Sequence, residues 1–320
     1  MVTLPTLDAS SNLPLHEPFS RATALAAGVS DYQLRTLVGE GYLRRPVAGL
    51  YVASHVPDSI ELRCRLLSLV VPDDCFVCDR TAAWLYAGAR ALGPNEHLSV
   101  PAISCFRPSD AGRLRNTITN SGERAIAPRD LRVVHGLLAT TPLRTALDLG
   151  RLERTRDLRL HGMDTMLSLG QFTLDELLAE VPRFKRQRGV VMLRVLAPLA
   201  DGGSESFGES ALRLRWHDAA IPRPRTQIPI MVGDIEVARV DMGIEELLLG
   251  GEYDGEEWHS DEDQQRHDDE RRRFLDEGRG WSIEVFRKED VFGHHQDADR
   301  RLRAAYVEAR RTLGERTFII

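Results

Sequence analysis

Lysine is nearly absent from this sequence: Lys185 and Lys288 are the only two, and arginine supplies the rest of the Lys and Arg charge. We interpret this bias as the mark of a GC-rich coding sequence rather than of function. The formal net charge is -6, so the chain as a whole does not attract nucleic acid. Any contact with DNA must therefore come from local basic patches.

Long apolar runs are also missing, and we expect no leader peptide. No run approaches the about 18 apolar residues of a membrane span, and residues 1–14 lack the basic start and apolar core of a signal peptide. At 320 residues, 42% hydrophobic and 28% charged, the chain resembles an ordinary folded protein of two or three domains. We expect a cytoplasmic protein with no membrane partner.

Cysteine is rare, with four residues in the chain. Cys75 and Cys78 have the spacing of half a zinc site, but no second C-x-x-C or H-x-x-x-H pair follows at the spacing of a zinc finger. We expect free thiols in an apolar, strand-like stretch and no metal at these residues.

Two helices and a hairpin are expected after a flexible arm at residues 1–15. A short Ala-rich helix reaches Gly28, and Ser30 is placed to cap a second helix over residues 31–38. Two short strands then flank residues 46–49. Together these elements predict a winged helix-turn-helix over residues 16–55.

Polar and basic side chains on the second helix and the hairpin are the candidate DNA contacts. Such side chains on a helix suit base edges, and arginines on a wing suit phosphates. The candidates are Gln33, Arg35, Thr36, Arg44 and Arg45. The alternative is a module that serves only for interaction with another protein.

The same segment resembles a known family. It carries Gly-Val-Ser at residues 28–30 and G-x-L-R-R-x3-G-x-Y at residues 41–51. This pattern is similar to the N-terminal winged-helix domain of the abortive-infection (AbiEi-type) antitoxins of type IV toxin-antitoxin systems. The resemblance implies DNA binding, often autoregulatory, and a cognate toxin protein as a partner.

Residues 56–150 read as a small α/β connecting domain. We expect helices over residues 60–71 and 81–91 and strands over residues 97–100 and 131–134. Arg144 and Asp148 have i,i+4 spacing on a further helix, and their expected role is an ion pair rather than catalysis.

Residues 151–200 read as a helical linker with breaks near Gly170 and Pro182. The basic run at residues 183–189 is either a phosphate-contacting patch or a solvated helix end. Residues 201–204, Asp-Gly-Gly-Ser, are the expected boundary of a last domain over residues 201–320.

The last domain shows the order αβββαβα. Its expected elements are a helix at 211–220, strands at 227–232, 235–243 and 247–254, a charged helix at 261–277, a strand at 281–286 and a helix at 294–313. This order predicts a mixed α/β fold in which helices flank one sheet.

Three carboxylates mark this domain as a candidate metal site. Asp241 lies in an alternating strand pattern, and Glu252 and Asp254 lie two apart at the end of the next strand. A hairpin across residues 243–246 would bring the three together, and crowded carboxylates need a cation or protons to offset their repulsion. Hard cations such as Mg²⁺, or Mn²⁺ in its place, prefer such oxygen ligands.

The domain also resembles the PD-(D/E)XK nucleases, and more closely the bacterial domains related to very-short-patch repair endonucleases. The matching segments are SESFGESALRL at 204–214, VARVDMG at 237–243 and EYDGEEWH at 252–259. The resemblance implies a restriction-endonuclease-like fold and metal-dependent phosphodiester hydrolysis. It assigns the catalytic roles to Glu209, Asp241, Glu252, Asp254 and His259.

One position departs from the family pattern. Asp254 stands where these nucleases usually carry a lysine, so His259 is the expected proton-transfer group. The leading hypothesis is a metal-dependent DNA endonuclease with an attached winged-helix domain, in defence or DNA repair. The alternatives are an antitoxin-type transcriptional regulator with an inactive nuclease-like domain, and a nuclease that cleaves RNA.

Overall fold

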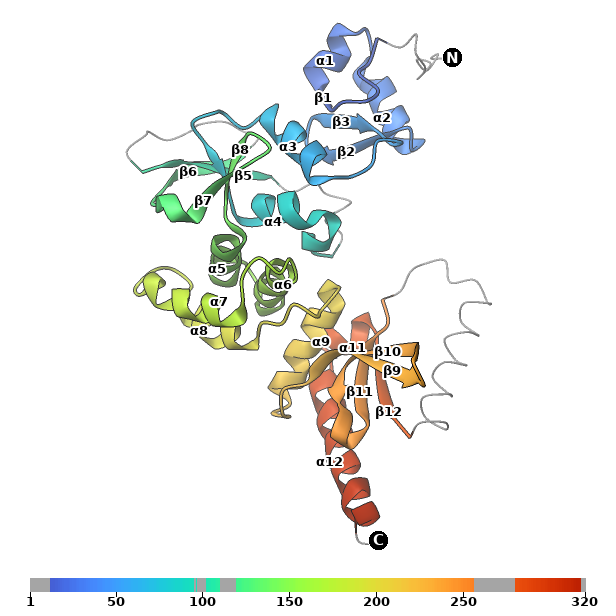
Figure 1. Ribbon diagram of the computed structural model, residues 1–320. Helices are drawn as coiled ribbons and strands as arrows, with labels where there is room; N and C mark the ends of the chain where they lie inside the picture. Colours follow the sequence, from blue (N-terminus) through green and yellow to red (C-terminus); the bar gives the residue numbers. More distant parts are fainter. Residues whose placement is uncertain (1–11, 95, 97–101, 110–118, 256–279, 318–320) are drawn as a thin grey trace. The chain divides into compact units, whose positions relative to one another are not determined.

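The computed structural model describes residues 12–94, 96, 102–109, 119–255 and 280–317 (Figure 1). The chain divides into two compact units, Met1–Leu149 and Gly150–Ile320. Each unit combines helices with β-sheet, so the protein has a mixed α/β fold, as the sequence predicts. No helix among the described residues is long and apolar enough to cross a membrane.

The first unit begins with a three-stranded sheet of order β1-β3-β2 and two helices. The elements are β1 (Phe19–Ser20), α1 (Arg21–Ala26), α2 (Asp31–Gly39), β2 (Leu43–Val47) and β3 (Leu50–Ala53). Ser30 caps α2 in a capping box with Gln33, which confirms the predicted helix start. Buried Phe19, Leu34 and Leu37 form the core beneath the sheet.

The rest of the first unit is built on a five-stranded sheet of order β6-β5-β4-β8-β7. Its strands are β4 (Phe76–Val77), β5 (Ile103–Pro108), β6 (Thr119–Arg124), β7 (Leu131–Val134) and β8 (Leu137–Thr140). Its helical elements are α3 (Ile60–Ser68), α4 (Asp79–Ala87), η1 (Gly88–Ala91), η2 (Pro128–Asp130) and α5 (Pro142–Leu152), which continues into the second unit. The predicted strand at 97–100 lies outside the described residues.

A buried charge network holds this α/β region together. Arg144 Nε donates to Asp148 Oδ2 at 2.8 Å, which confirms the predicted i,i+4 pair, and Arg144 Nη1 reaches Asp130 Oδ2 at 2.8 Å. All four cysteines are buried free thiols, and Cys75 and Cys78 flank strand β4. Burial raises the pKa of Cys75 to about 11, so this thiol is protonated at neutral pH.

The second unit starts with a helical layer. It contains α6 (Arg156–Leu167), α7 (Leu174–Glu180), η3 (Val181–Phe184), α8 (Val190–Leu196) and η4 (Ala197–Leu199). The chain leaves the helix before Gly170, where φ is +65°, and again around Pro182, so both predicted breaks are confirmed. In the basic run, Arg183 pairs with Glu180 and Phe184 is buried.

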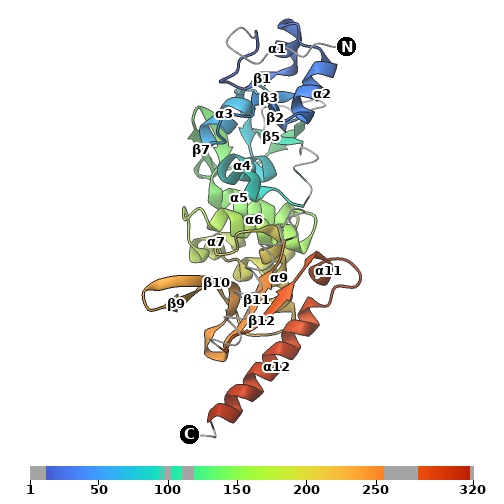
Figure 2. The same ribbon diagram turned by 90° about the vertical axis from the view of Figure 1, so that its right-hand side faces the viewer.

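A four-stranded sheet of order β12-β11-β10-β9 follows. The elements are α9 (Phe207–Asp218), β9 (Arg225–Val232), β10 (Ile235–Ile244), η5 (Glu245–Leu247), β11 (Leu249–Tyr253), β12 (Ser282–Phe286), α11 (Lys288–Val291) and α12 (Ala298–Thr317). Strand β10 pairs antiparallel with β9 and β11, whereas β12 pairs parallel with β11. The sheet is therefore mixed, as predicted, and the β9–β10 hairpin extends past the other strands (Figure 2). The predicted helix at 261–277 lies outside the described residues.

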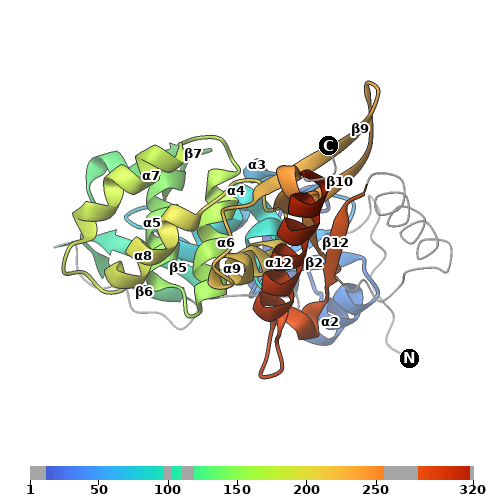
Figure 3. The same ribbon diagram turned by 90° about the horizontal axis from the view of Figure 1, so that it is seen from below.

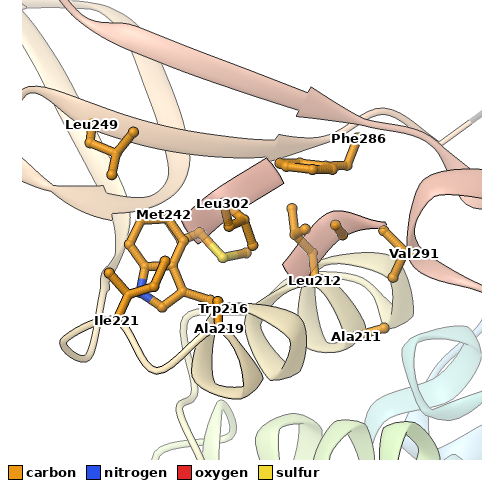
Figure 4. Close-up of a cluster of buried hydrophobic side chains, with 11 residues drawn as sticks. Ala211, Leu212, Trp216, Ala219, Ile221, Met242, Leu249, Phe286, Val291 and Leu302 are labelled. Carbon is orange, nitrogen blue, oxygen red and sulfur yellow. The ribbon is translucent and has the colours of Figure 1, made fainter. Parts of the chain in front are cut away.

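Helices α9 and α12 pack against each other and against the sheet (Figure 3). Trp216 and Leu212 of α9 point toward Met242 and Phe286 of the sheet in the apolar core (Figure 4). Burial of these large side chains is the main stabilising contribution, at about 1.5–3 kcal/mol for each fully buried side chain.

The helical layer belongs to the same compact unit as the sheet. Arg213 of α9 pairs with Asp164 of α6 at 2.5 Å, and both side chains are fully buried. Arg215 adds a second pair with Asp157 at 2.8 Å. The sequence predicts a helical linker over 151–200, whereas in the structure these helices belong to the same compact unit as residues 201–320. Contacts between side chains far apart in the sequence cause this difference.

Candidate functional site

The first turn of α9 carries Glu209, the predicted catalytic residue of that helix. Ser206 caps the helix, because its hydroxyl accepts a hydrogen bond from the Glu209 amide at 3.1 Å. The Glu209 carboxylate in turn accepts a hydrogen bond from the Glu205 backbone amide at 2.8 Å. These local bonds hold the Glu209 side chain at the start of the helix.

Gly208 allows the first turn of α9 to pack closely against the end of β11. A Cβ atom added at Gly208 would lie 2.0 Å from Cε1 of Tyr253, so the ring occupies the space that any side chain at 208 would need. The ring of Tyr253 also meets Phe292 edge to face, with centroids 6.4 Å apart. Close packing of Tyr253 on α9 therefore depends on the missing side chain at Gly208.

Tyr253 also holds Asp241 in place. The backbone amide of Tyr253 donates a hydrogen bond to Asp241 Oδ2 at 2.8 Å. The antiparallel register pairs Met242 with Gly251, and its continuation by one residue sets Asp241 beside Glu252. Asp241 is half-buried and Glu252 is only 5% exposed. The structure thus brings two of the predicted metal ligands to neighbouring positions on adjacent strands.

Gln227 joins the site from β9, and sequence reasoning missed it. It lies opposite Asp241, between the register pairs Val240↔Ile228 and Met242↔Thr226. Its φ of +51° is in the left-handed region, which costs a residue other than glycine roughly 1–3 kcal/mol. The Gln227 amide donates to Glu209 Oε2 at 3.3 Å. The only signal in the sequence is a polar residue at the start of a predicted strand.

The electrostatics of Glu209 differ from those of an exposed carboxylate. Burial raises its pKa to about 7, and the negative charge of Asp241 adds to this rise. Hydrogen bonds from the Glu205 amide and Ser206 oppose the shift in pKa. Near neutral pH the Glu209 carboxyl therefore exists in both protonation states, which suits proton transfer.

Asp254 is placed differently from the prediction. Its carboxylate lies 3.7 Å from Arg287 Nε, and its backbone amide donates to the Phe286 carbonyl oxygen at 2.9 Å. Within the described part of the chain, no three His, Cys, Asp or Glu side chains are grouped so as to hold a metal ion. The predicted trio of Asp241, Glu252 and Asp254 is therefore not grouped in this way, and the Asp254 carboxylate lies next to a cation instead.

Two carboxylates still fit the chemistry of Mg²⁺. This ion keeps several water ligands and is usually bound by one or two protein carboxylates together with phosphate oxygens of the substrate. Asp241 and Glu252 supply two hard oxygen donors at adjacent strand positions. A closed cage of three or more protein ligands is not required for this role. The predicted His259 lies outside the described residues.

The candidate DNA-binding side chains of α2 divide into two groups. Gln33 uses its side-chain oxygen to accept a hydrogen bond from the Ser30 amide at 2.9 Å, and Thr36 Oγ1 donates to the Tyr32 carbonyl oxygen at 3.0 Å. Arg35 is exposed to solvent. The polar atoms of Gln33 and Thr36 that are bonded here support the helix, and Arg35 presents its charge outward.

The two arginines of the β2–β3 hairpin also differ. The Arg44 guanidinium is half-buried and donates to the Val56 carbonyl oxygen, whereas Arg45 is exposed. The register of β2 against β3 shifts between Arg44 and Val47, so the two arginines lie where the regular alternation of the strand is interrupted. Arg45 is therefore the hairpin arginine placed for a phosphate.

Comparison with known proteins identifies relatives in one organism. The uncharacterized proteins Rv2248 and MT2308 of Mycobacterium tuberculosis, from strains H37Rv and CDC 1551, are each 32% identical to this chain over 259 residues. The match covers 81% of this chain and 90% of each relative. No family model matches the chain.

Proposed function

The chain belongs to the same protein family as Rv2248 and MT2308 of Mycobacterium tuberculosis, and we propose that it is a metal-dependent DNA endonuclease. In this proposal the C-terminal domain hydrolyses a phosphodiester bond, and the N-terminal helices and hairpin bind DNA as a winged helix-turn-helix. Defence against foreign DNA and DNA repair are the processes that such an activity would serve.

The observation that carries the proposal is the position of Asp241. Its carboxylate accepts a hydrogen bond from the Tyr253 amide, which sets it beside the buried Glu252. Two carboxylates in one partly buried place repel each other unless a cation or protons offset their charge. A divalent cation and the phosphate that it attracts account for this arrangement.

The residues around this pair have separate roles in the proposal. Asp241 and Glu252 would hold Mg²⁺ or Mn²⁺, which supplies positive charge against the phosphate and lowers the pKa of a water molecule. Glu209 accepts the proton of the attacking water as the water oxygen bonds to phosphorus and the bond to the leaving oxygen breaks. Gln227 holds the Glu209 carboxylate through its amide. Glu209 thus supplies a proton acceptor in a site whose usual lysine is replaced by Asp254.

Supercoiled plasmid provides the test. We expect the full chain to nick it only with added Mg²⁺ or Mn²⁺, and Asp241→Asn to lower the rate at least about 100-fold, the loss typical of one charge-stabilising group. Asp234→Asn is the matched control, because Asp234 is an exposed carboxylate in the turn of the same hairpin. No nicking by the wild type, or equal nicking by Asp241→Asn, would overturn the proposal. A single-stranded RNA of the same sequence shows in parallel whether RNA is the preferred substrate.

One observation favours a second function. Asp254 takes the place of the lysine and lies near Arg287, which weakens the catalytic set. The alternative is an antitoxin-type transcriptional regulator, with an inactive nuclease-like domain and a cognate toxin as partner. It predicts salt-sensitive binding to the DNA upstream of its own gene without cleavage of that DNA. Binding that survives Arg35→Gln combined with Arg45→Gln contradicts this alternative.

A further inference from the structure

A pocket of about 580 Å³ opens in the first unit, between strand β2 and the α4–η1 segment. Its size is that of a site for a small organic molecule, which typically encloses about 300–1,000 Å³. Neither the proposed nuclease site nor the exposed Arg35 belongs to it. The described residues that line it and enter the inference are Leu43, Arg44, Pro46, Arg80, Trp84 and Leu92.

The walls of the pocket are mostly apolar. Leu43 and Pro46 contribute from the strand, and Trp84 and Leu92 contribute from the helical side. Trp84 is half-buried, so part of its indole remains accessible. An indole and a proline ring favour flat apolar molecules, because flat rings stack with little loss of conformational entropy.

Some of the charged side chains around the pocket form ion pairs, and others do not. Arg80 forms an ion pair with Glu96, and Asp58 accepts two hydrogen bonds from Arg63, at 2.9 and 2.6 Å. The two acids at the pocket are therefore already neutralised. Among the described residues, neither Arg44 nor its neighbour Arg45 has a carboxylate within ion-pair distance.

Arg44 has an unused donor in this place. Its Nη2 donates to the Val56 carbonyl oxygen, while its Nε is buried and meets no acceptor among the described residues. The Arg44 guanidinium therefore carries a positive charge that no carboxylate of the described residues offsets, and an anionic group of a ligand against the accessible part of this side chain would offset it. The half-buried Arg44 is thus the point at which the pocket selects for negative charge.

We propose that this pocket binds a small, flat, mostly apolar molecule that carries one anionic group, with that group against Arg44. The apolar part of the ligand lies between Pro46 and Trp84. Arg45 also lines the pocket, so a bound ligand would lie beside the arginine that we propose for a phosphate contact. The proposal does not depend on the nuclease function.

The fluorescent probe 8-anilino-1-naphthalenesulfonate has this chemistry and tests the site in the full chain. Trp84 is the sole tryptophan of residues 1–149. We expect saturable binding with energy transfer from tryptophan to the bound probe, and Trp84→Phe to remove most of that transfer while directly excited probe fluorescence persists. Energy transfer that is unchanged in Trp84→Phe would place the probe elsewhere and overturn the proposal.

Variants of Arg44 test whether this residue selects for the anionic group. We expect Arg44→Gln to weaken binding of the sulfonate about tenfold, the loss expected for one charge-assisted hydrogen bond. The affinity of Arg44→Gln for the neutral probe N-phenyl-1-naphthylamine should fall by less than about twofold. Arg44→Lys should recover most of the affinity for the sulfonate. Arg35→Gln removes the same charge from the same unit outside the pocket and is the control. Equal weakening by Arg44→Gln and Arg35→Gln, or equal losses for the charged and neutral probes, would show no anion selection by Arg44.

Discussion

The backbone amide of Tyr253 donates a 2.8 Å hydrogen bond to the carboxylate of Asp241, while the ring of Tyr253 covers Gly208 of α9. One residue at the end of β11 therefore fixes both the strand carboxylate and the helix that carries Glu209. The geometry of the proposed site depends on this contact as much as on the carboxylates themselves.

Gly208→Ala should destabilise the C-terminal unit. The new Cβ atom would lie 2.0 Å from Cε1 of Tyr253, so the ring must move, and overpacking of this kind typically costs about 1–3 kcal/mol. Gly39→Ala is the matched control, because among the described residues nothing beyond its chain neighbours and its own helix backbone lies within 4 Å of a Cβ at that position. Urea unfolding of the full chain measures both. A Gly208→Ala variant as stable as Gly39→Ala would show that the Tyr253 contact is not tight.

Glu209→Gln should change the dependence of stability on pH. The folded-state pKa of Glu209 is about 7 and its ordinary value is 4.5, so the folded state binds more protons between these values. The unfolding free energy of the wild type therefore falls relative to Glu209→Gln as pH rises from about 4.5 to 7. Above that range we expect the unfolding free energy of Glu209→Gln to have risen relative to the wild type by on the order of 1–3 kcal/mol. This figure includes a discount for partial exposure of the side chain.

Urea midpoints at pH 5 and pH 8, converted to free energies, measure this effect. The control is Glu205→Gln, which removes an exposed carboxylate just before the same helix and leaves Glu209 in place. It should change the pH dependence much less than Glu209→Gln does, because the charge of Glu205 is the smallest of the causes that shift the pKa of Glu209. An equal difference between wild type and Glu209→Gln at both pH values would contradict the raised pKa.

Replacement of Gln227 tests the strained backbone. The left-handed conformation at this residue costs about 1–2 kcal/mol with an L side chain and nothing for glycine. Glycine loses about 0.4–1 kcal/mol more chain entropy on folding, so Gln227→Gly should be at least as stable as Gln227→Ala. Both variants lose the amide that holds Glu209, so their activities should fall together. A clearly more stable alanine variant, by urea unfolding, would contradict the assigned conformation.

The buried pair of Arg213 and Asp164 should show strong coupling. Removal of one partner leaves a buried charge, which typically costs about 3–5 kcal/mol, so Arg213→Met and Asp164→Leu should each be severe. The double variant should cost less than the sum of the two, because it leaves neither charge unpaired. A double-mutant cycle by urea unfolding gives the coupling energy. Strict additivity would mean that the pair is not formed.

DNA binding should distinguish Arg45 from Arg44. Each phosphate contact adds about 0.9 to the slope of log affinity against log salt concentration. Arg45→Gln should therefore lower this slope by about 0.9, and Arg44→Gln should leave it nearly unchanged because Val56 holds the Arg44 guanidinium. Mobility shifts on the protein's own upstream DNA at several salt concentrations measure the slope. Equal changes for the two arginines would contradict the assignment of the phosphate contact to Arg45.

The elements of this protein follow from local sequence. Ser30 and Gln33 close a capping box within one turn, and Arg144 and Asp148 meet at i,i+4 spacing. The order of the described helices and strands around the mixed sheet also follows from the spacing of apolar residues. Each of these features depends on residues a few positions apart, so their geometry is fixed once the local backbone conformation is chosen.

Only the tertiary structure decided how the candidate site is assembled. The sequence predicted that Asp254 joins Asp241 and Glu252, but its carboxylate lies near Arg287, which precedes α11 and is distant in sequence. The left-handed conformation of Gln227 and the packing of Tyr253 on Gly208 had no local signal either. These features depend on the register and close approach of separate elements, which burial of the whole core sets and no short stretch of sequence encodes.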